Sequence, residues 1–175
     1  MKIAIIYESK TGNTKLVAEA INEICIKDND TVLIPVETAL EENFDIQGID
    51  FFFLGSWTDK GDCGQTIKNF ANALDNKKIA LFGTAGFGGS QDYFDKLTAR
   101  FSSSILDSNR ILGSFYCQGK MPQDVRNHYQ AMLQQNPQDK NLKVTIANFD
   151  KAQTHPNEKD LNKAKEFAKK MIDNL

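Results

Sequence analysis

The chain has 175 residues, of which 41% are hydrophobic and 25% are charged, a composition typical of a globular protein with a sizeable core. Its formal net charge of −2 argues against a dedicated nucleic-acid-binding protein, which is usually basic. The sequence holds no apolar run of about 18 residues, so we expect no membrane span. The short apolar start before Glu8 is too brief for a secretion signal, and we expect a cytoplasmic protein.

Short apolar runs alternate with helical patterns along the chain, and this alternation predicts an α/β fold. Four of the five runs are almost continuously apolar, as expected for strands that are buried on both faces of a parallel sheet. Helices between them would form right-handed crossovers that cover both faces. The predicted strands are residues 2–7, 31–36, 50–55, 78–84 and 110–116.

Apolar residues recur at helical spacing between most of these strands. Residues 37–49 show no clear helix, and residues 118–157 form an insertion between the fifth strand and the last helix. Inside the insertion we expect a helix over 122–135 and a short extra strand over 143–149. No repeat, low-complexity tract or linker is visible, so we predict a single domain over residues 1–175. The other predicted helices are 14–27, 64–75, 90–104 and 158–173.

The cysteines and histidines form no recognisable reactive site. Cys25, Cys63 and Cys117 lie far apart, contain no CxxC pair, and have no metal-ligand spacing with His128 or His155. We therefore expect free thiols in a reducing compartment and no metal site. No Ser/His/Asp arrangement is present either, and we predict no catalytic residues.

In an open parallel sheet, ligands bind beyond the carboxyl ends of the strands, where the strand order reverses. The loop after the first strand, SKTGNT, leads directly into a helix, whose free N–H groups and dipole favour an anion. It matches neither the Walker A loop nor GxGxxG, which favours a mononucleotide phosphate over a pyrophosphate. The alternative is an ordinary helix cap and turn. The predicted contact residues are Ser9, Lys10, Thr11, Gly12, Asn13 and Thr14.

The loop after the third strand contains the only tryptophan, Trp57. A large planar side chain in a polar loop is suited to stacking on a flat aromatic ligand. The alternative is that the indole covers the end of the sheet. The predicted contact residues of this loop are Ser56, Trp57, Thr58, Asp59, Lys60 and Gly61.

The loop after the fourth strand, GTAGFGG, is rich in glycine around Phe87. Glycines let the backbone approach a ligand closely and leave its N–H groups available as donors. Such loops are common, but together the three loops indicate a flat ring on a phosphate tail, with Phe87 facing Trp57 across the ring. The predicted contact residues are Thr84, Ala85, Gly86, Phe87 and Gly88.

These motifs resemble those of the flavodoxin family. The SxTGNT loop matches the phosphate signature of the family, and GTAGFGG is similar to the third flavin loop of short clostridial-type flavodoxins. The second loop, GSWTDKG, departs in length and sequence from the best-known members. The resemblance covers nearly the whole chain except the insertion. It implies a flavodoxin-like three-layer sandwich with a five-stranded parallel sheet of order 2-1-3-4-5, which binds FMN non-covalently.

The resemblance also implies an electron carrier, a monomer that docks transiently on redox protein donors and acceptors. The segments CQGKMP and HPNE resemble those of flavodoxin-like proteins of anaerobic gut bacteria, some of which are associated with tetrapyrrole reduction, notably bilirubin reductase. One alternative is an FMN-dependent NAD(P)H:quinone oxidoreductase or related oxidoreductase, with a substrate pocket completed by the insertion. The other is a non-redox binding module without FMN.

Stacking on the two aromatic residues and three further features would tune the flavin. A carbonyl at or next to the Lys60–Gly61 peptide would accept a hydrogen bond from flavin N5 after reduction. Asp59 and Asp62 would lower the reduction potential through their charge. Lys120 would offset that charge near flavin N1 and O2 or contact a partner, with a plain surface turn as the alternative.

Overall fold

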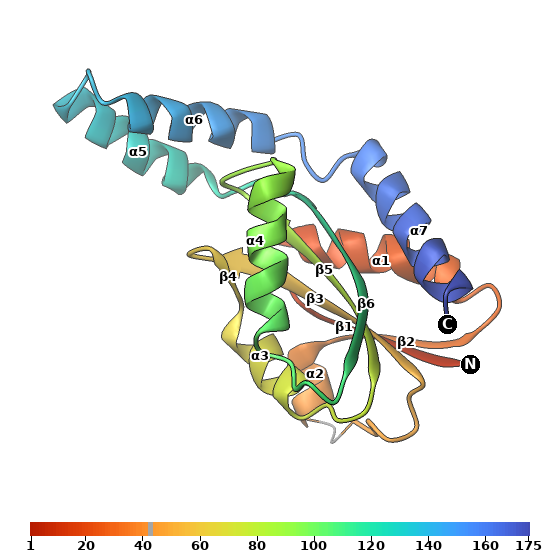
Figure 1. The fold of residues 1–175 in the computed structure, drawn as a ribbon. Coiled ribbons are helices and arrows are strands. Elements are labelled where there is room, and N and C mark those ends of the chain that lie inside the picture. The colour runs from red at the N-terminus through yellow and green to blue at the C-terminus, as the bar shows by residue number, and fades with distance from the viewer. Residues whose placement is uncertain (42–43) are drawn as a thin grey trace.

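The computed structural model describes residues 1–41 and 44–175 (Figure 1). The strands are β1 (Lys2–Glu8), β2 (Asp30–Pro35), β3 (Phe51–Asp59), β4 (Asp62–Cys63), β5 (Lys78–Ala85) and β6 (Arg110–Gln118). They form one sheet with the order β2-β1-β3-β5-β6, all paired in parallel, while the two-residue β4 pairs antiparallel with β3. With β4 set aside, this is the predicted order 2-1-3-4-5.

Helices cover both faces of the sheet and make three layers, as predicted (Figure 1). The helices are α1 (Asn13–Cys25), α2 (Val36–Glu41), α3 (Gln65–Asn72), α4 (Gln91–Ser102), α5 (Gln123–Gln135), α6 (Lys140–Ala152) and α7 (Glu158–Asp173). Buried residues of α1 and α7 share one hydrophobic cluster with the sheet, and those of α2 and α3 share another with Phe101 of α4. Phe94 and Leu97 of α4 pack with Ala85 in a third cluster. Within the described ranges, no helix combines the length and the apolar character needed to cross a membrane.

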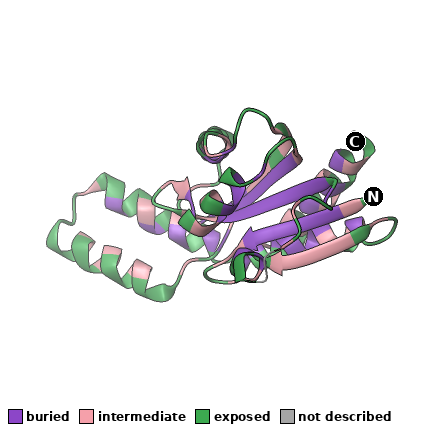
Figure 2. Ribbon diagram, turned by 90° about the horizontal axis from the view of Figure 1, so that it is seen from below, coloured by how far each residue is buried: buried purple, intermediate pink, exposed green. Residues whose placement is uncertain are grey.

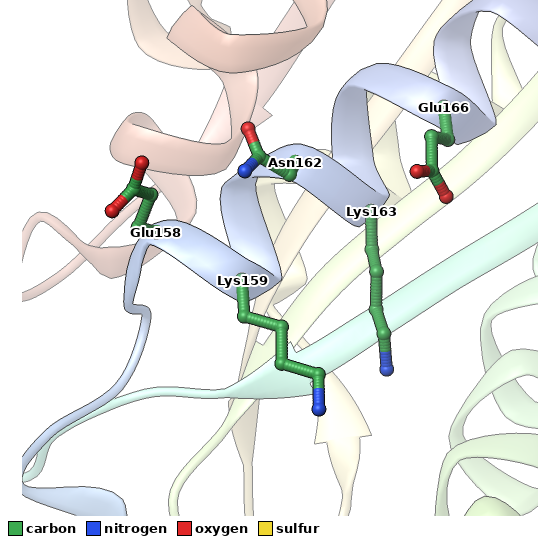
Figure 3. Close-up of a pocket in the computed structure, with 5 residues that line it drawn as sticks. All are labelled: Glu158, Lys159, Asn162, Lys163 and Glu166. Carbon is green, nitrogen blue, oxygen red and sulfur yellow. The ribbon is translucent and has the colours of Figure 1, made fainter.

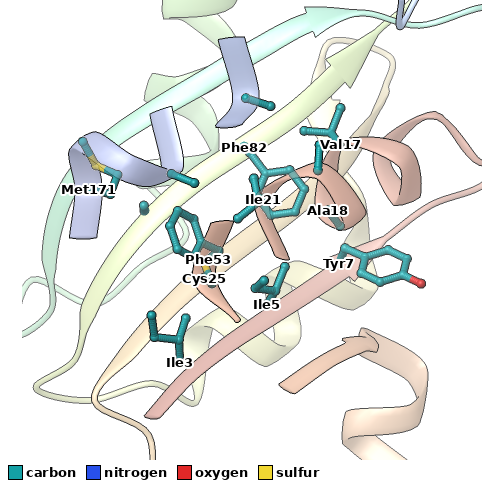
Figure 4. Close-up of a cluster of buried hydrophobic side chains, with 14 of the residues drawn as sticks. Ile3, Ile5, Tyr7, Val17, Ala18, Ile21, Cys25, Phe53, Phe82 and Met171 are labelled. Carbon is teal, nitrogen blue, oxygen red and sulfur yellow. The ribbon is translucent and has the colours of Figure 1, made fainter. Parts of the chain in front are cut away.

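The run of three phenylalanines at the start of β3 shows why the central strands are continuously apolar. Successive side chains of a strand point to opposite faces. Phe51 and Phe53 therefore join the cluster under α1 and α7, whereas Phe52 joins the cluster on the other face. All three are fully buried, and burying each such side chain contributes about 1.5–3 kcal/mol. Figure 4 shows the first cluster, and Figure 2 shows that the sheet is the most buried part of the fold.

The predicted strand over residues 143–149 is wrong, because this segment lies in α6. The carboxylate of Asp139 caps the helix by accepting hydrogen bonds from the backbone N–H groups of Asn141 and Leu142, at 2.8 and 3.0 Å. β-Branched residues suggested a strand, but the buried apolar residues recur every three or four positions, on one helical face. These buried residues are Leu142, Ile146, Phe149 and Ala152.

Residues 37–49 were expected to hold no clear helix, yet the six-residue α2 covers the start of this segment. Its core contacts come from Val36 and Ala39, which are both buried. Two apolar residues are too few to give a periodic pattern, so a helix of this length leaves little trace in the sequence. Residues 42–43 lie outside the described residues.

The insertion forms a helical hairpin of α5 and α6 that extends from the body as an arm (Figure 1). Arg126 of α5 joins Asp150 of α6 through an ion pair, with 2.7 Å between Nε and Oδ1. α5 itself buries none of its residues, and Figure 2 shows the arm as mostly exposed. Because the arm begins directly after β6, its base lies at the carboxyl edge of the sheet.

Candidate functional site

The loop between β1 and α1 leaves the start of α1 open to a ligand. Gly12 occupies the N-cap with a φ of 87°, a conformation that favours glycine. Gly12 has no side chain with which to cap the helix, but Ser9 Oγ accepts a hydrogen bond from the backbone N–H of Lys15 in the first turn, at 3.3 Å. The first turn contains no acidic residue. The other N–H groups at the helix start, together with the helix dipole, therefore favour an anion such as a phosphate.

Asn13 connects this loop to the base of the arm. Its Nδ2 donates hydrogen bonds to Thr11 Oγ1, at 3.0 Å, and to the carbonyl of Lys120, at 2.8 Å. Its Oδ1 is buried and has no hydrogen-bond partner among the described residues. A buried polar atom without a partner costs about 1–3 kcal/mol. The Oδ1 atom is therefore suited to accept a hydrogen bond from a ligand hydroxyl.

The three predicted loops line one cavity of about 530 Å³, a volume in the range of small-molecule sites. The first loop contributes Lys10, Thr11 and Asn13, the second contributes residues 57–61, and the third contributes residues 84–87. The remaining predicted contact residues lie in the same loops without lining this cavity in the described structure: Ser9, Gly12, Thr14, Ser56 and Gly88.

Two of these remaining residues hold the loops in place instead. Thr14 and Thr84 are buried and join the first loop to the third, with 2.9 Å between their Oγ1 atoms. Ser56 Oγ accepts a hydrogen bond from the backbone N–H of Gly64, at 2.8 Å, and donates to the carbonyl of Trp57, at 2.6 Å. These contacts fix the relative positions of the loops around the cavity.

The indole of Trp57 lines the cavity and is held by a residue that the sequence reasoning missed. Its Nε1 donates a hydrogen bond to Glu8 Oε1 at 3.1 Å. Lys10 Nζ lies 4.9 Å from the centroid of the indole ring, within the range of a cation–π interaction. A charged residue at the end of a buried strand, at the ligand-binding edge, was the available signal for Glu8.

Phe87 lines the same cavity and remains 44% exposed. Its ring packs edge-to-face on Tyr129 of α5, with centroids 5.8 Å apart and an interplanar angle of 86°. Val125 and Tyr129 also line the cavity, so the arm supplies part of its wall. The sequence predicted a helix over residues 122–135, which contains both, but not that this helix lies against the loops.

Lys60 and Gly61 form the turn between β3 and β4, with φ values of 48° and 80°. The carbonyl of Gly61 accepts a hydrogen bond from Nη1 of Arg100 in α4. Burial raises the pKa of Asp62, but the Lys68 ammonium, 2.6 Å away, and the Cys63 N–H outweigh this effect and hold the pKa below its ordinary value.

The three thiols are free and buried. Burial raises the pKa of Cys25 to about 12, and burial together with the charge of Asp62 raises the pKa of Cys63 to about 12. Burial also raises the pKa of Cys117. The thiolate forms are therefore scarce at neutral pH, which suits a structural role.

A second hollow, of about 400 Å³, lies on the outer face of α7 (Figure 3). Every residue that lines it comes from this one helix and carries a charged or amide side chain. The hollow is therefore a solvated helix face. Its lining residues are Glu158, Lys159, Asn162, Lys163 and Glu166.

One cavity at the carboxyl edge of the parallel sheet brings together the start of a helix and two aromatic side chains. This arrangement defines a nucleotide-binding α/β protein. The family model described as flavodoxin domain matches residues 4–169. The chain belongs to the flavodoxin family.

Two curated relatives are similar over nearly the whole chain. The flavodoxin-like domain-containing protein BilS of Clostridioides difficile (strain CD3) is 36% identical over 172 residues, which cover 98% of this chain and 97% of that protein. The protein of the same name from Clostridium symbiosum (strain WAL-14163) is 37% identical over 174 residues, which cover 92% and 90% of the two chains. Among solved structures, a flavoprotein from Lactobacillus acidophilus NCFM in complex with FMN has a TM-score of 0.51 and 21% identity, covering 66% of this chain and 93% of that one.

Proposed function

We propose that this chain is a cytoplasmic, FMN-dependent electron carrier that passes electrons between redox proteins, with a tetrapyrrole reductase such as bilirubin reductase as an acceptor. The observation that carries the proposal is the single cavity in which the open start of α1 lies beside Trp57 and Phe87. When bound, FMN supplies the electron transfer, and the protein supplies binding and electrostatics.

The residues of the cavity fit the parts of FMN. The N–H groups at the start of α1 are suited to hold the phosphate. The unpartnered Oδ1 of Asn13 is an acceptor that suits a hydroxyl of the ribityl chain. Trp57 and Phe87 offer apolar faces and edges to the ring system.

The charges that line the cavity favour the negatively charged reduced cofactor. Lys10, Lys60 and Lys120 contribute three ammonium groups, against the carboxyl groups of Asp59 and Asp124. Opposite charges at close range stabilise one another most where water is partly excluded. We expect these lysines to raise the reduction potential and the two carboxylates to lower it.

The lining residues also support a carrier over a stand-alone enzyme. In the described structure, neither histidine lines the cavity. The sequence resemblance to flavodoxin-like proteins associated with bilirubin reductase, together with the similarity to two clostridial BilS proteins, supports the class of partner. A monomer suits transient docking on such a partner.

One observation favours a second candidate, an FMN-dependent NAD(P)H:quinone oxidoreductase. The arm places Val125 and Tyr129 in the cavity wall, beyond the three flavin loops. An apolar and aromatic wall next to a flavin is suited to a flat organic substrate.

An anaerobic reductive titration of the FMN-loaded protein, followed by visible spectroscopy, tests the proposal. A carrier takes up electrons in two resolved one-electron steps. By itself it does not oxidise NAD(P)H, and once reduced it passes electrons to a tetrapyrrole reductase. A protein that binds no FMN contradicts the proposal. Direct two-electron reduction by NAD(P)H favours the oxidoreductase.

A further inference from the structure

We propose that Arg100 is a positioning residue, which fixes the carbonyl of Gly61 and leaves the Lys60–Gly61 peptide to reorient toward the flavin. The proposal rests on the FMN binding proposed above. It concerns a contact between α4 and the β3–β4 turn, which are far apart in the sequence.

The turn has the geometry of a two-residue hairpin connection. Thr58 pairs with Cys63 and Asp59 pairs with Asp62 across β3 and β4, so Lys60 and Gly61 are the two central residues. Positive φ at both central residues, here 48° and 80°, is what a type I′ turn requires. Reversing the central peptide gives a type II′ turn, which favours glycine at the first central position, here occupied by Lys60.

Gly61 tolerates this reversal, because glycine adopts positive and negative φ almost equally well. Lys60 is strained in the reversed turn, so a contact to the ligand must offset that strain. The reversal turns over the carbonyl of Lys60. Within the described part of the chain, the structure shows no hydrogen-bond donor to that carbonyl. Lys60 and Gly61 both line the cavity, so a reoriented Lys60 carbonyl remains at the ligand.

The neighbouring peptide is held in place by Arg100. Its Nη1 donates to the carbonyl of Gly61, and a Cβ added to Gly61 would lie only 2.8 Å from the same Nη1. The guanidinium stays charged at any working pH, and a charge-assisted hydrogen bond is roughly twice as strong as a neutral one. The carbonyl of Gly61 is therefore occupied, whereas the carbonyl of Lys60 is available.

The end of the turn is anchored from its other side as well. Asp62 accepts a hydrogen bond from Lys68 of α3, at 2.6 Å, and its second oxygen accepts one from the N–H of Cys63, at 2.8 Å. α3 therefore holds β4 through Asp62, and α4 holds the end of the turn through the carbonyl of Gly61. Rotation in the turn is confined to its central peptide, which selects one carbonyl for the flavin.

Substituting Arg100→Gln releases the carbonyl of Gly61, so two carbonyls then compete and neither is pre-organised. We expect the ratio of the equilibrium constants of the two one-electron reduction steps to fall at least ~10-fold, comparable to the loss of one charged hydrogen bond. Arg100→Lys keeps the charge but offers a less rigid donor, and we expect an intermediate ratio.

The experiment combines potentiometric titration of the FMN-loaded variants with amide hydrogen exchange in the FMN-free protein. The matched control is Arg126→Gln, which removes the arginine that pairs with Asp150 on the arm. We expect the FMN dissociation constant to change less than about threefold in all variants, because the phosphate loop is untouched. Exchange at the amides of Gly61 and Asp62 accelerates in Arg100→Gln only.

The outcomes separate this inference from the proposed function. A wild-type protein that binds no FMN defeats the proposed function, and the exchange data then decide whether Arg100 holds the turn. A wild-type protein with two resolved steps, matched by Arg100→Gln in both the ratio and the exchange rates, overturns the role of Arg100 while the carrier function stands. A ratio that falls equally in Arg126→Gln also overturns it.

Discussion

The carboxylate of Glu8 joins the indole of Trp57 to the first turn of α3. Oε1 accepts a hydrogen bond from Trp57 Nε1, at 3.1 Å, and Oε2 accepts one from the backbone N–H of Ile67, at 2.8 Å. Gly64 leaves room for this carboxylate, since a Cβ there would lie 2.3 Å from Oε2. One side chain therefore orients the indole and also caps a helix with negative charge.

Glu8→Gln should weaken both contacts. A glutamine side chain has a single acceptor oxygen, and its NH2 group would face the second N–H donor. We expect the FMN-free protein to lose about 1–2 kcal/mol of unfolding free energy, and the FMN dissociation constant to rise about 3- to 10-fold. Urea denaturation and flavin fluorescence titration measure the two effects. Glu19→Gln is the control, since among the described residues Glu19 forms an ion pair with Lys15 alone, which is exposed, and the substitution should change little. Equal effects in the two variants would show that the orienting role is absent.

The buried Thr14–Thr84 hydrogen bond should behave as a coupled pair. Thr14→Val leaves the hydroxyl of Thr84 without this partner and should cost about 1–2 kcal/mol of unfolding free energy. The double variant Thr14→Val/Thr84→Val should cost clearly less than the sum of the single variants. Denaturant unfolding of the FMN-free proteins measures the coupling, and strict additivity would contradict it.

The Asp62–Lys68 pair should make stability depend on pH at the acidic end. Because the pKa of Asp62 is lowered in the folded protein, its contribution is present above the ordinary pKa of 3.8 and is lost as the pH falls through the folded value. The difference in unfolding free energy between wild type and Asp62→Asn should therefore shrink below about pH 4. In a Lys68→Met background this pH dependence should weaken, and an unchanged profile there would rule out Lys68 as its cause.

The raised pKa values of the three buried thiols predict slow alkylation. At pH 8, Cys25 and Cys63, with pKa values of about 12, should react with iodoacetamide at least ~100-fold more slowly than free cysteine. Mass spectrometry of the native and the urea-unfolded protein measures the labelling. Rapid labelling of Cys63 in the native protein would point to a reactive rather than a structural thiol.

The sequence predicted those features that depend on neighbouring residues. Phe51 to Phe53 lie in one strand whose side chains fill both faces, so a short apolar run was enough to recognise it. The three loops were found because each directly follows such a strand. Features that depend on distant pairings were missed. Arg100 lies 39 residues from Gly61, and Tyr129 meets Phe87 only through the path of the arm.

The α6 segment shows a different limit. Its β-branched residues favour a strand locally. Its apolar residues, however, are buried together only when the segment forms a helix that packs on α5. The partner helix α5 lies in the same insertion, and the Arg126–Asp150 ion pair joins the two helices. Tertiary packing therefore decides against the local preference.

The two ends of the arm meet at its base. The N–H of Lys120 donates to the carbonyl of His155 at 2.8 Å, so the chain leaves and re-enters the body at nearly the same place. A segment with joined ends can lengthen, shorten or change its sequence without shifting the strands beneath it. The arm is in this sense a replaceable part on a fixed base, and the side chains that it presents beside the cavity can vary while the phosphate loop and the sheet stay the same.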